Sequence, residues 1–105
     1  MTNSNRKGKA GELELAHFLT DNGHPARRGQ QFKGGADSPD VICPSLPIHW
    51  EAKRTEALRL HQAMQQAIDE AAPDKTPVVA HRRNRGDWLA VLRLDDLIQL
   101  LEARA

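Results

Sequence analysis

Two carboxylates and a lysine are spaced in this chain so that a β-sheet would bring them together. Side chains of a strand alternate between its faces, so in segment 48–53 Glu51 and Lys53 point the same way, roughly 7 Å apart. Asp40 opens the apolar run 41–43, a natural neighbouring strand. Two carboxylates and an amine at one sheet edge are the groups that metal-dependent hydrolysis of a phosphodiester bond requires.

The predicted ligands suit a small, hard cation. Mg²⁺ prefers oxygen, keeps several waters and commonly takes one or two protein carboxylates, a number that Asp40 and Glu51 supply; Mn²⁺ would substitute. The backbone carbonyl of Ala52 would be a further ligand if the strand edge is frayed or bent there. Lys53 would orient or deprotonate the attacking water, or stabilise the charge on the phosphate, and the sequence leaves these roles open.

A third carboxylate, Glu12, comes from a predicted helix over residues 6–22. At 100° per residue, Leu15 and Leu19 lie within about 60° of Glu12, whereas Glu14 falls on the far side. A glutamate beside an apolar stripe is rarely buried without a partner. Either the edge of the stripe is solvated there or Glu12 belongs to the site.

Hydrophobic periodicity outlines the elements that must carry these groups. It predicts strands at 40–43, 48–53, 77–81 and 88–92, and further helices at 56–72 and 95–102. Segment 24–38 is a strand or loop, 83–87 suits a hairpin, and Asp95 is the expected N-cap of the last helix. The 105 residues then form a single α/β domain with a central mixed sheet of about four strands flanked by helices, after a flexible tail of residues 1–5.

Aromatic and histidine residues near these strands have simple expected roles. His49 shares the face of the predicted site, where it either borders the site or is an ordinary surface histidine. His61 flanks the apolar stripe of the second helix and is expected to pack. Trp50 and Trp88 are expected to be core anchors.

Composition narrows the cellular setting. Hydrophobic content of 39% and charged content of 28% are ordinary for a soluble domain, and the net charge is only +1. Cys43 is the single cysteine, so no intramolecular disulfide forms, and a buried thiol in a reducing cytoplasm is expected. No segment predicts a signal peptide or a membrane span.

Basic residues form clusters rather than an even coat. They are candidates for sequence-independent contacts to DNA phosphates, and the plainer interpretation is solvated surface charge. The residues concerned are Lys7, Lys9, Arg27, Arg28, Lys33, Arg82, Arg83 and Arg85.

Three segments together resemble a known superfamily. Lys7-Gly8-Lys9 followed by Glu12, then Ser38-Pro39-Asp40-Val41-Ile42, then Trp50-Glu51-Ala52-Lys53 are similar to the PD-(D/E)XK nucleases, and nearly the whole chain resembles the compact Holliday junction resolvase-like members from phages and prophages. The resemblance implies the restriction-endonuclease-like fold. It also implies a Mg²⁺-dependent DNA endonuclease with Glu12, Asp40, Glu51 and Lys53 in the active-site positions.

The same resemblance implies an extended site and a substrate. A glutamine on the second helix often belongs to such sites, and Gln66 matches best, with Gln62 one turn earlier. Structure-selective cutting of branched DNA is expected, and a four-way junction needs two symmetric cuts and hence a homodimer. A DNA-binding module without catalysis, or an adaptor domain whose carboxylates form ordinary surface ion pairs, are the alternatives.

Overall fold

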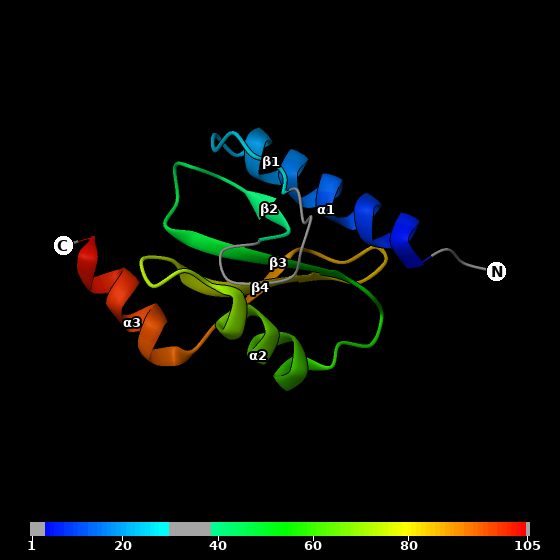
Figure 1. Cartoon of the computed structure of the whole chain (residues 1–105). Coiled ribbons are helices and arrows are strands. Elements are labelled where there is room, and N and C mark those ends of the chain that lie inside the picture. The colour runs from blue at the N-terminus through cyan, green and yellow to red at the C-terminus, as the bar shows by residue number, and fades with distance from the viewer. Residues whose placement is uncertain (1–3, 30–38, 105) are drawn as a thin grey trace.

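The computed structural model describes residues 4–29 and 39–104, with side chains in the first helix described from residue 8 onward. The elements follow in the order α1 (Ser4–Asp21), β1 (Arg27–Arg28), β2 (Val41–Ile42), β3 (Ile48–Arg54), α2 (Leu60–Glu70), β4 (Thr76–Arg82), β5 (Leu89–Val91) and α3 (Leu94–Ala103) (Figure 1).

A five-stranded sheet in the order β1-β2-β3-β4-β5 forms the centre of the chain. The central pair β3 and β4 is parallel and joined by α2, whereas the other neighbouring pairs are antiparallel. The α/β class with a mixed sheet is therefore confirmed. The expected four strands are five, because Arg27–Arg28, within the segment read as strand or loop, pairs with Val41–Ile42.

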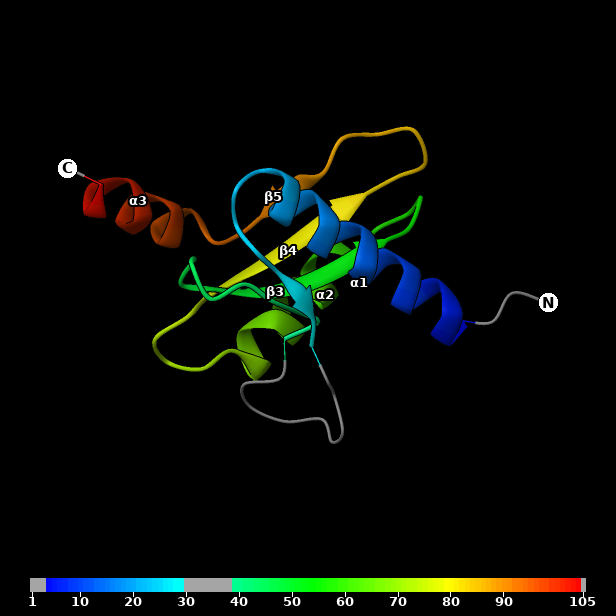
Figure 2. The same ribbon diagram turned by 90° about the horizontal axis from the view of Figure 1, so that it is seen from above.

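The two longer helices cover opposite faces of the sheet (Figures 1 and 2). Beneath α1, Leu15 and Leu19 pack in one apolar cluster with Trp50 of β3. On the other face, Met64 of α2 packs in a second cluster with Val79 of β4. Since neighbouring residues of a strand point to opposite faces, the burial of Trp50 under α1 turns the next residue of β3 toward α2.

The contact between α1 and the sheet depends on a glycine. A Cβ atom on Gly11 would lie 2.8 Å from Cβ of Arg54, so only glycine permits this approach. Because the helix rests on Gly11 as well as on its leucines, Glu14 flanks the contact and forms ion pairs with Arg54 and Arg82. The prediction that Glu14 faces away from the sheet was wrong, since a glycine adds no apolar side chain to the stripe.

Several boundaries differ from the predictions for local reasons. The second helix begins at Leu60 rather than at 56, because the Thr55 hydroxyl donates to the carbonyl of Ala57 instead of capping a helix N–H. The cap of α3 is Arg93, and the Asp95 carboxylate accepts from the N–H of Asp96, so the predicted Asp95 cap was wrong.

The predicted tail of residues 1–5 was wrong in part, because α1 already begins at Ser4; residues 1–3 lie outside the described residues. No helix in residues 4–29 and 39–104 combines the length and the apolar character needed to span a bilayer.

The last helix stands apart from the layers. Figure 2 shows α3 beyond the end of the sheet, away from α1 and α2. None of its described residues is buried, although it carries several large apolar side chains.

Candidate active site

Asp40 directly precedes β2, at the point where the pairing between β2 and β3 ends. The described pairing between these strands is confined to Val41 and Trp50, and the N–H of Asp40 donates to the Trp50 carbonyl over 2.9 Å. The Asp40 carboxylate then accepts from the N–H of Ala52 at 2.9 Å. A residue's N–H and C=O leave a strand on the same side, so the Ala52 carbonyl is directed toward the Asp40 side as well. The two predicted oxygen ligands, the Asp40 carboxylate and the Ala52 carbonyl, therefore lie at the same edge of β3.

The residue that follows β1, Gly29, contacts the backbone of Asp40. The N–H of Gly29 donates to the Asp40 carbonyl over 2.8 Å. A Cβ atom on Gly29 would lie 2.1 Å from the Pro39 carbonyl oxygen, closer than atoms can approach. Glycine at position 29 is thus a steric requirement for the placement of the Pro39-Asp40 backbone.

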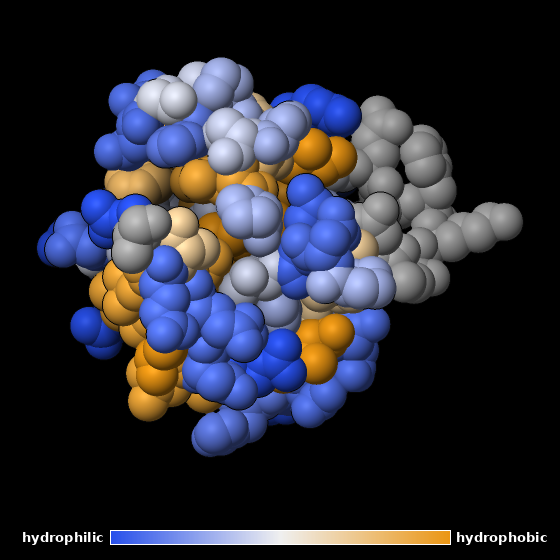
Figure 3. All heavy atoms as spheres, turned by 90° about the vertical axis from the view of Figure 1, so that its left-hand side faces the viewer, coloured by the Kyte–Doolittle hydropathy of each residue, from blue (hydrophilic) through white to orange (hydrophobic). Residues whose placement is uncertain are grey.

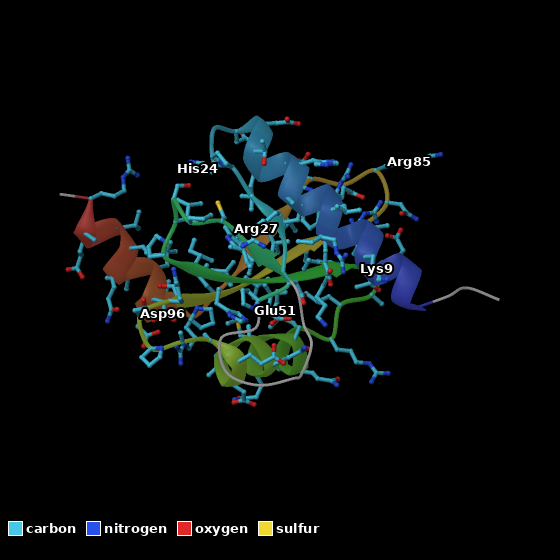
Figure 4. All side chains as sticks on the ribbon, turned by 45° about the horizontal axis from the view of Figure 1, so that its top comes forward. Lys9, His24, Arg27, Glu51, Arg85 and Asp96 are labelled. Carbon is cyan, nitrogen blue, oxygen red and sulfur yellow. The ribbon has the colours of Figure 1, made fainter. Side chains whose placement is uncertain are left out.

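Glu51 is the most deeply buried acid of the site. Its exposed fraction is 0%, and it projects from β3 toward α2 (Figure 4). Oε1 forms a hydrogen bond with Nε2 of His49 over 2.9 Å, whereas no described residue offers a donor to Oε2. Burial, followed by the nearby carboxyl groups of Asp40 and Glu70, raises the pKa of Glu51 to about 10. The carboxyl group therefore holds a proton at neutral pH unless a cation takes its place.

Lys53 shares the α2 face with Glu51, as the strand alternation predicts. Its Nζ donates to the side-chain oxygen of Gln66 over 3.3 Å, and Gln66 in turn donates to Glu70 over 3.5 Å. The amide of Gln66 thus accepts from the Lys53 ammonium through its oxygen and donates to the Glu70 carboxylate through its nitrogen. A chain of polar contacts thus runs from β3 along α2.

A cavity opens beside Lys53. It has a volume of about 250 Å³ and lies between the end of β3 and the start of α2. Both predicted extended-site glutamines, Gln62 and Gln66, line it, together with Arg59. Polar and cationic groups around an open cavity next to a lysine suit an anionic ligand.

Glu12 reaches the region from the other face. It is half-buried, and Nε of Arg28 donates to its Oε1 over 2.9 Å. Burial raises the pKa of Glu12 above its ordinary value; the bond from Arg28 opposes this, and the charge of Asp40 adds to it. Asp40 thus interacts electrostatically with both Glu12 and Glu51, which lie on opposite sides of the sheet.

All four predicted catalytic residues are therefore found in one region. The predicted phosphate contacts are more scattered. Lys9 and Arg85 lie toward one end of the molecule in Figure 4, whereas Arg27 lies nearer the sheet. Arg28 is engaged by Glu12, and Arg82 by Glu14. Arg83 is exposed, the Lys7 side chain is not described, and Lys33 lies outside the described residues.

Two site residues escaped the sequence analysis in different ways. Glu70 was not considered, although it lies one helical turn after Gln66, and this spacing was the available signal. For His49 two alternatives were open, a border of the site or an ordinary surface histidine; it is 1% exposed and bonded to Glu51, so the surface alternative was wrong. His61 was expected to pack and is exposed instead.

The donor set fits a divalent cation. Asp40 and Glu51 offer carboxylate oxygens, the carbonyl of Ala52 points to the same margin, and one buried oxygen of Glu51 lacks a donor within the described part of the chain. Oxygen ligands of this kind and number are those that Mg²⁺ takes in proteins.

Comparisons with protein-family models, with curated proteins and with solved structures find no match to this chain.

Proposed function

We propose that this chain is a Mg²⁺-dependent DNA endonuclease with a restriction-endonuclease-like arrangement, related to the PD-(D/E)XK nucleases. The observation that carries the proposal is the buried carboxyl group of Glu51, which interacts with the Asp40 carboxyl group and shares a face of β3 with Lys53. Burying an acid among other acids destabilises a fold. Such an arrangement is typical of a functional site in which the carboxylates bind a cation.

The residues divide the work of phosphodiester hydrolysis. Asp40, Glu51 and the Ala52 carbonyl would hold the cation, with Mn²⁺ as a substitute for Mg²⁺. When bound, the cation lowers the pKa of a water molecule and neutralises charge on the phosphate. Lys53, next to the open cavity, orients or deprotonates that water or stabilises the phosphate charge. Glu12 provides a further carboxylate near Asp40.

The proposed substrate is DNA, held mainly through its backbone. The sheet margin and its surroundings offer exposed basic side chains such as Arg27 and Lys9, which suit phosphates rather than bases. A chain of 105 residues has little surface for reading a long sequence. Structure-selective cleavage of branched DNA, such as a four-way junction, follows as the proposed activity.

A homodimer would supply the two cuts that a four-way junction needs, and the C-terminal part offers a surface for it. Large apolar side chains are exposed along β5 and α3: Leu89, Leu94, Leu97, Ile98 and Leu101. The face that turns toward the viewer in Figure 3 carries apolar surface of this kind. Within the described residues β5 is also the last strand of the sheet. A two-fold axis beside this strip would bring it against the same strip of a second copy and remove both from water.

Cleavage assays with matched variants test the proposal. Four-way junction, flap, fork and plain duplex DNA are incubated with Mg²⁺ and wild type, Glu51→Gln or Lys53→Ala. We expect cleavage of at least one branched substrate, reduced about 10²-fold or more in both variants. Glu102→Gln and Arg104→Ala remove one charge of each sign at exposed positions outside the site and should cleave like wild type. Equal activity of all five proteins, or none, would refute the proposal, and salt-sensitive binding without cleavage would indicate a DNA-binding module instead.

A further inference from the structure

Glu51 also belongs to a second group of residues that could bind a metal ion. A ring nitrogen of His49 and carboxyl oxygens of Glu51 and Glu70 lie within 4.8 Å of one another. His49 and Glu51 come from β3, and Glu70 is the last residue of α2. The topology of one parallel strand and its crossover helix thus brings together three groups that can bind metals.

The distances between these ligand atoms are close to those in a site that holds a metal ion. Two ligands of one transition-metal ion lie about 3 Å apart when adjacent and about 4.4 Å apart when opposite, given bonds of about 2.2 Å. His49 and Glu51 are already 2.9 Å apart. Glu70 is only half-buried at the end of its helix, so its side chain has room to adjust to a bound ion.

A buried oxygen supplies an independent indication of a ligand. Oε2 of Glu51 is enclosed, and no donor from residues 8–29 or 39–104 reaches it. An enclosed carboxylate oxygen without a donor destabilises the fold unless a proton or a cation neutralises the group. Asp40 and Glu70, the two groups whose charges act most strongly on Glu51, are themselves acidic.

The donor types separate this group from the Asp40 site. Asp40 and the Ala52 carbonyl offer oxygen alone, as Mg²⁺ prefers. His49 adds an imidazole nitrogen, which suits transition metals such as iron, nickel and zinc, whereas Mg²⁺ prefers oxygen ligands. We propose that His49, Glu51 and Glu70 form a second cation site that selects a transition-metal ion over Mg²⁺ and shares Glu51 with the first site. The inference rests on the proposed function only in the sharing of Glu51.

Gln66 fits this arrangement as a positioning residue. Its amide donates to Glu70 and accepts from Lys53, so it orients the Glu70 carboxylate and keeps the lysine at hydrogen-bond distance from the glutamine oxygen. A cation at the second site would therefore lie next to the same chain of contacts that positions Lys53.

The test counts bound Mn²⁺ by electron paramagnetic resonance and calorimetry on the full chain. Wild type should bind two Mn²⁺ ions, of which one persists in excess Mg²⁺. Glu70→Gln should lose the persistent ion, whereas Asp69→Asn, the same charge change at the preceding helix position, should keep it. Full exchange of the bound Mn²⁺ by Mg²⁺, or unchanged binding in Glu70→Gln, would overturn the inference.

A second measurement needs no variant. In excess Mg²⁺, one equivalent of Mn²⁺ should broaden the ring signals of His49 in the NMR spectrum of wild type more strongly than those of exposed His61, which lies near the other end of α2. Equal broadening of both rings would refute the site. DNA cleavage in Mg²⁺ separates the two proposals: cleavage with no persistent Mn²⁺ refutes only this inference, and a persistent Mn²⁺ without any cleavage refutes only the proposed function.

Discussion

The N–H of Ala52 donates to the carboxylate of Asp40 over 2.9 Å, so a side chain continues the link between β2 and β3 where strand pairing stops. This bond fixes the carboxylate beside the carbonyl of Ala52 and orients both toward one margin. Asp40 is thereby positioned by the backbone of the strand that carries Glu51. Residues that hold the Asp40 backbone should consequently control the site without contacting a substrate.

Gly29 is the clearest case. In Gly29→Ala the new methyl group would collide with the Pro39 carbonyl and force the Pro39-Asp40 backbone away from β1. We expect cleavage to fall about 10-fold or more and the unfolding free energy to fall by about 1–3 kcal/mol. Gly8→Ala, at a helical glycine with no atoms near a Cβ, is the control; it should leave cleavage unchanged and raise the unfolding free energy by up to about 1 kcal/mol. Assays of cleavage and of urea unfolding check this, and normal activity in Gly29→Ala would contradict it.

Stability should depend on pH through Glu51. Its pKa rises from 4.5 to about 10 on folding, so the folded state binds more protons between these values. The unfolding free energy then falls as pH rises across this range, by up to about 1.4 kcal/mol per pH unit. Glu51→Gln cannot ionise, so its melting temperature should exceed that of wild type at neutral and alkaline pH and change less with pH.

Thermal melts over a pH series, with Glu102→Gln as control, test this sign. The control should keep the steep dependence of wild type. A cation replaces the proton, so Mg²⁺ should raise the melting temperature of wild type more than that of Glu51→Gln. Parallel pH curves for wild type and Glu51→Gln would show that burial of this carboxyl group does not govern stability.

Two neighbouring arginines should have separable effects. Arg28 lowers the pKa of Glu12, so in Arg28→Gln that pKa should rise further and the acidic limb of the cleavage profile should move to higher pH. Arg27 is exposed, so Arg27→Gln should instead weaken DNA binding and reduce its salt dependence by about one unit of slope. Cleavage measured against pH and binding measured against salt distinguish them; identical behaviour of both variants would contradict the assignment.

The exposed apolar strip should mediate self-association. In Leu97→Asp/Leu101→Asp the strip carries charge, so a wild-type dimer should become a monomer, with little change in melting temperature of the fold because neither side chain is in the core. Gln99→Lys, an exposed polar position of the same helix, is the control. Light scattering after size-exclusion chromatography measures the mass, and a wild type that is monomeric at every concentration would refute the dimer.

Local periodicity predicted the elements and one face of the site. Alternation along 48–53 correctly placed Glu51 and Lys53 together, because the direction of a strand side chain depends only on the strand itself. The α/β class followed from the order of apolar runs for the same reason. Helix ends were less predictable, since the start of α2 depends on which group the Thr55 hydroxyl bonds.

Features that depend on contact between distant segments were missed. Burial of His49 requires α2 to cover β3, and the part played by Glu70 requires the last turn of that helix to face the strand. The side of α1 that meets the sheet was misjudged because Gly11, which has no side chain, forms the closest contact. Such facts come from packing between elements, which hydrophobic periodicity does not encode.

The two sides of β3 hold the site in different ways. Toward β4 the strand is paired along its whole length, whereas toward β2 it is paired in one register position. The direction of Glu51 and Lys53 therefore depends on the long ladder with β4, and that of Asp40 on a few single bonds from Gly29, Trp50 and Ala52. A substitution that disturbs one of these bonds would consequently displace Asp40 while Glu51 and Lys53 keep their places.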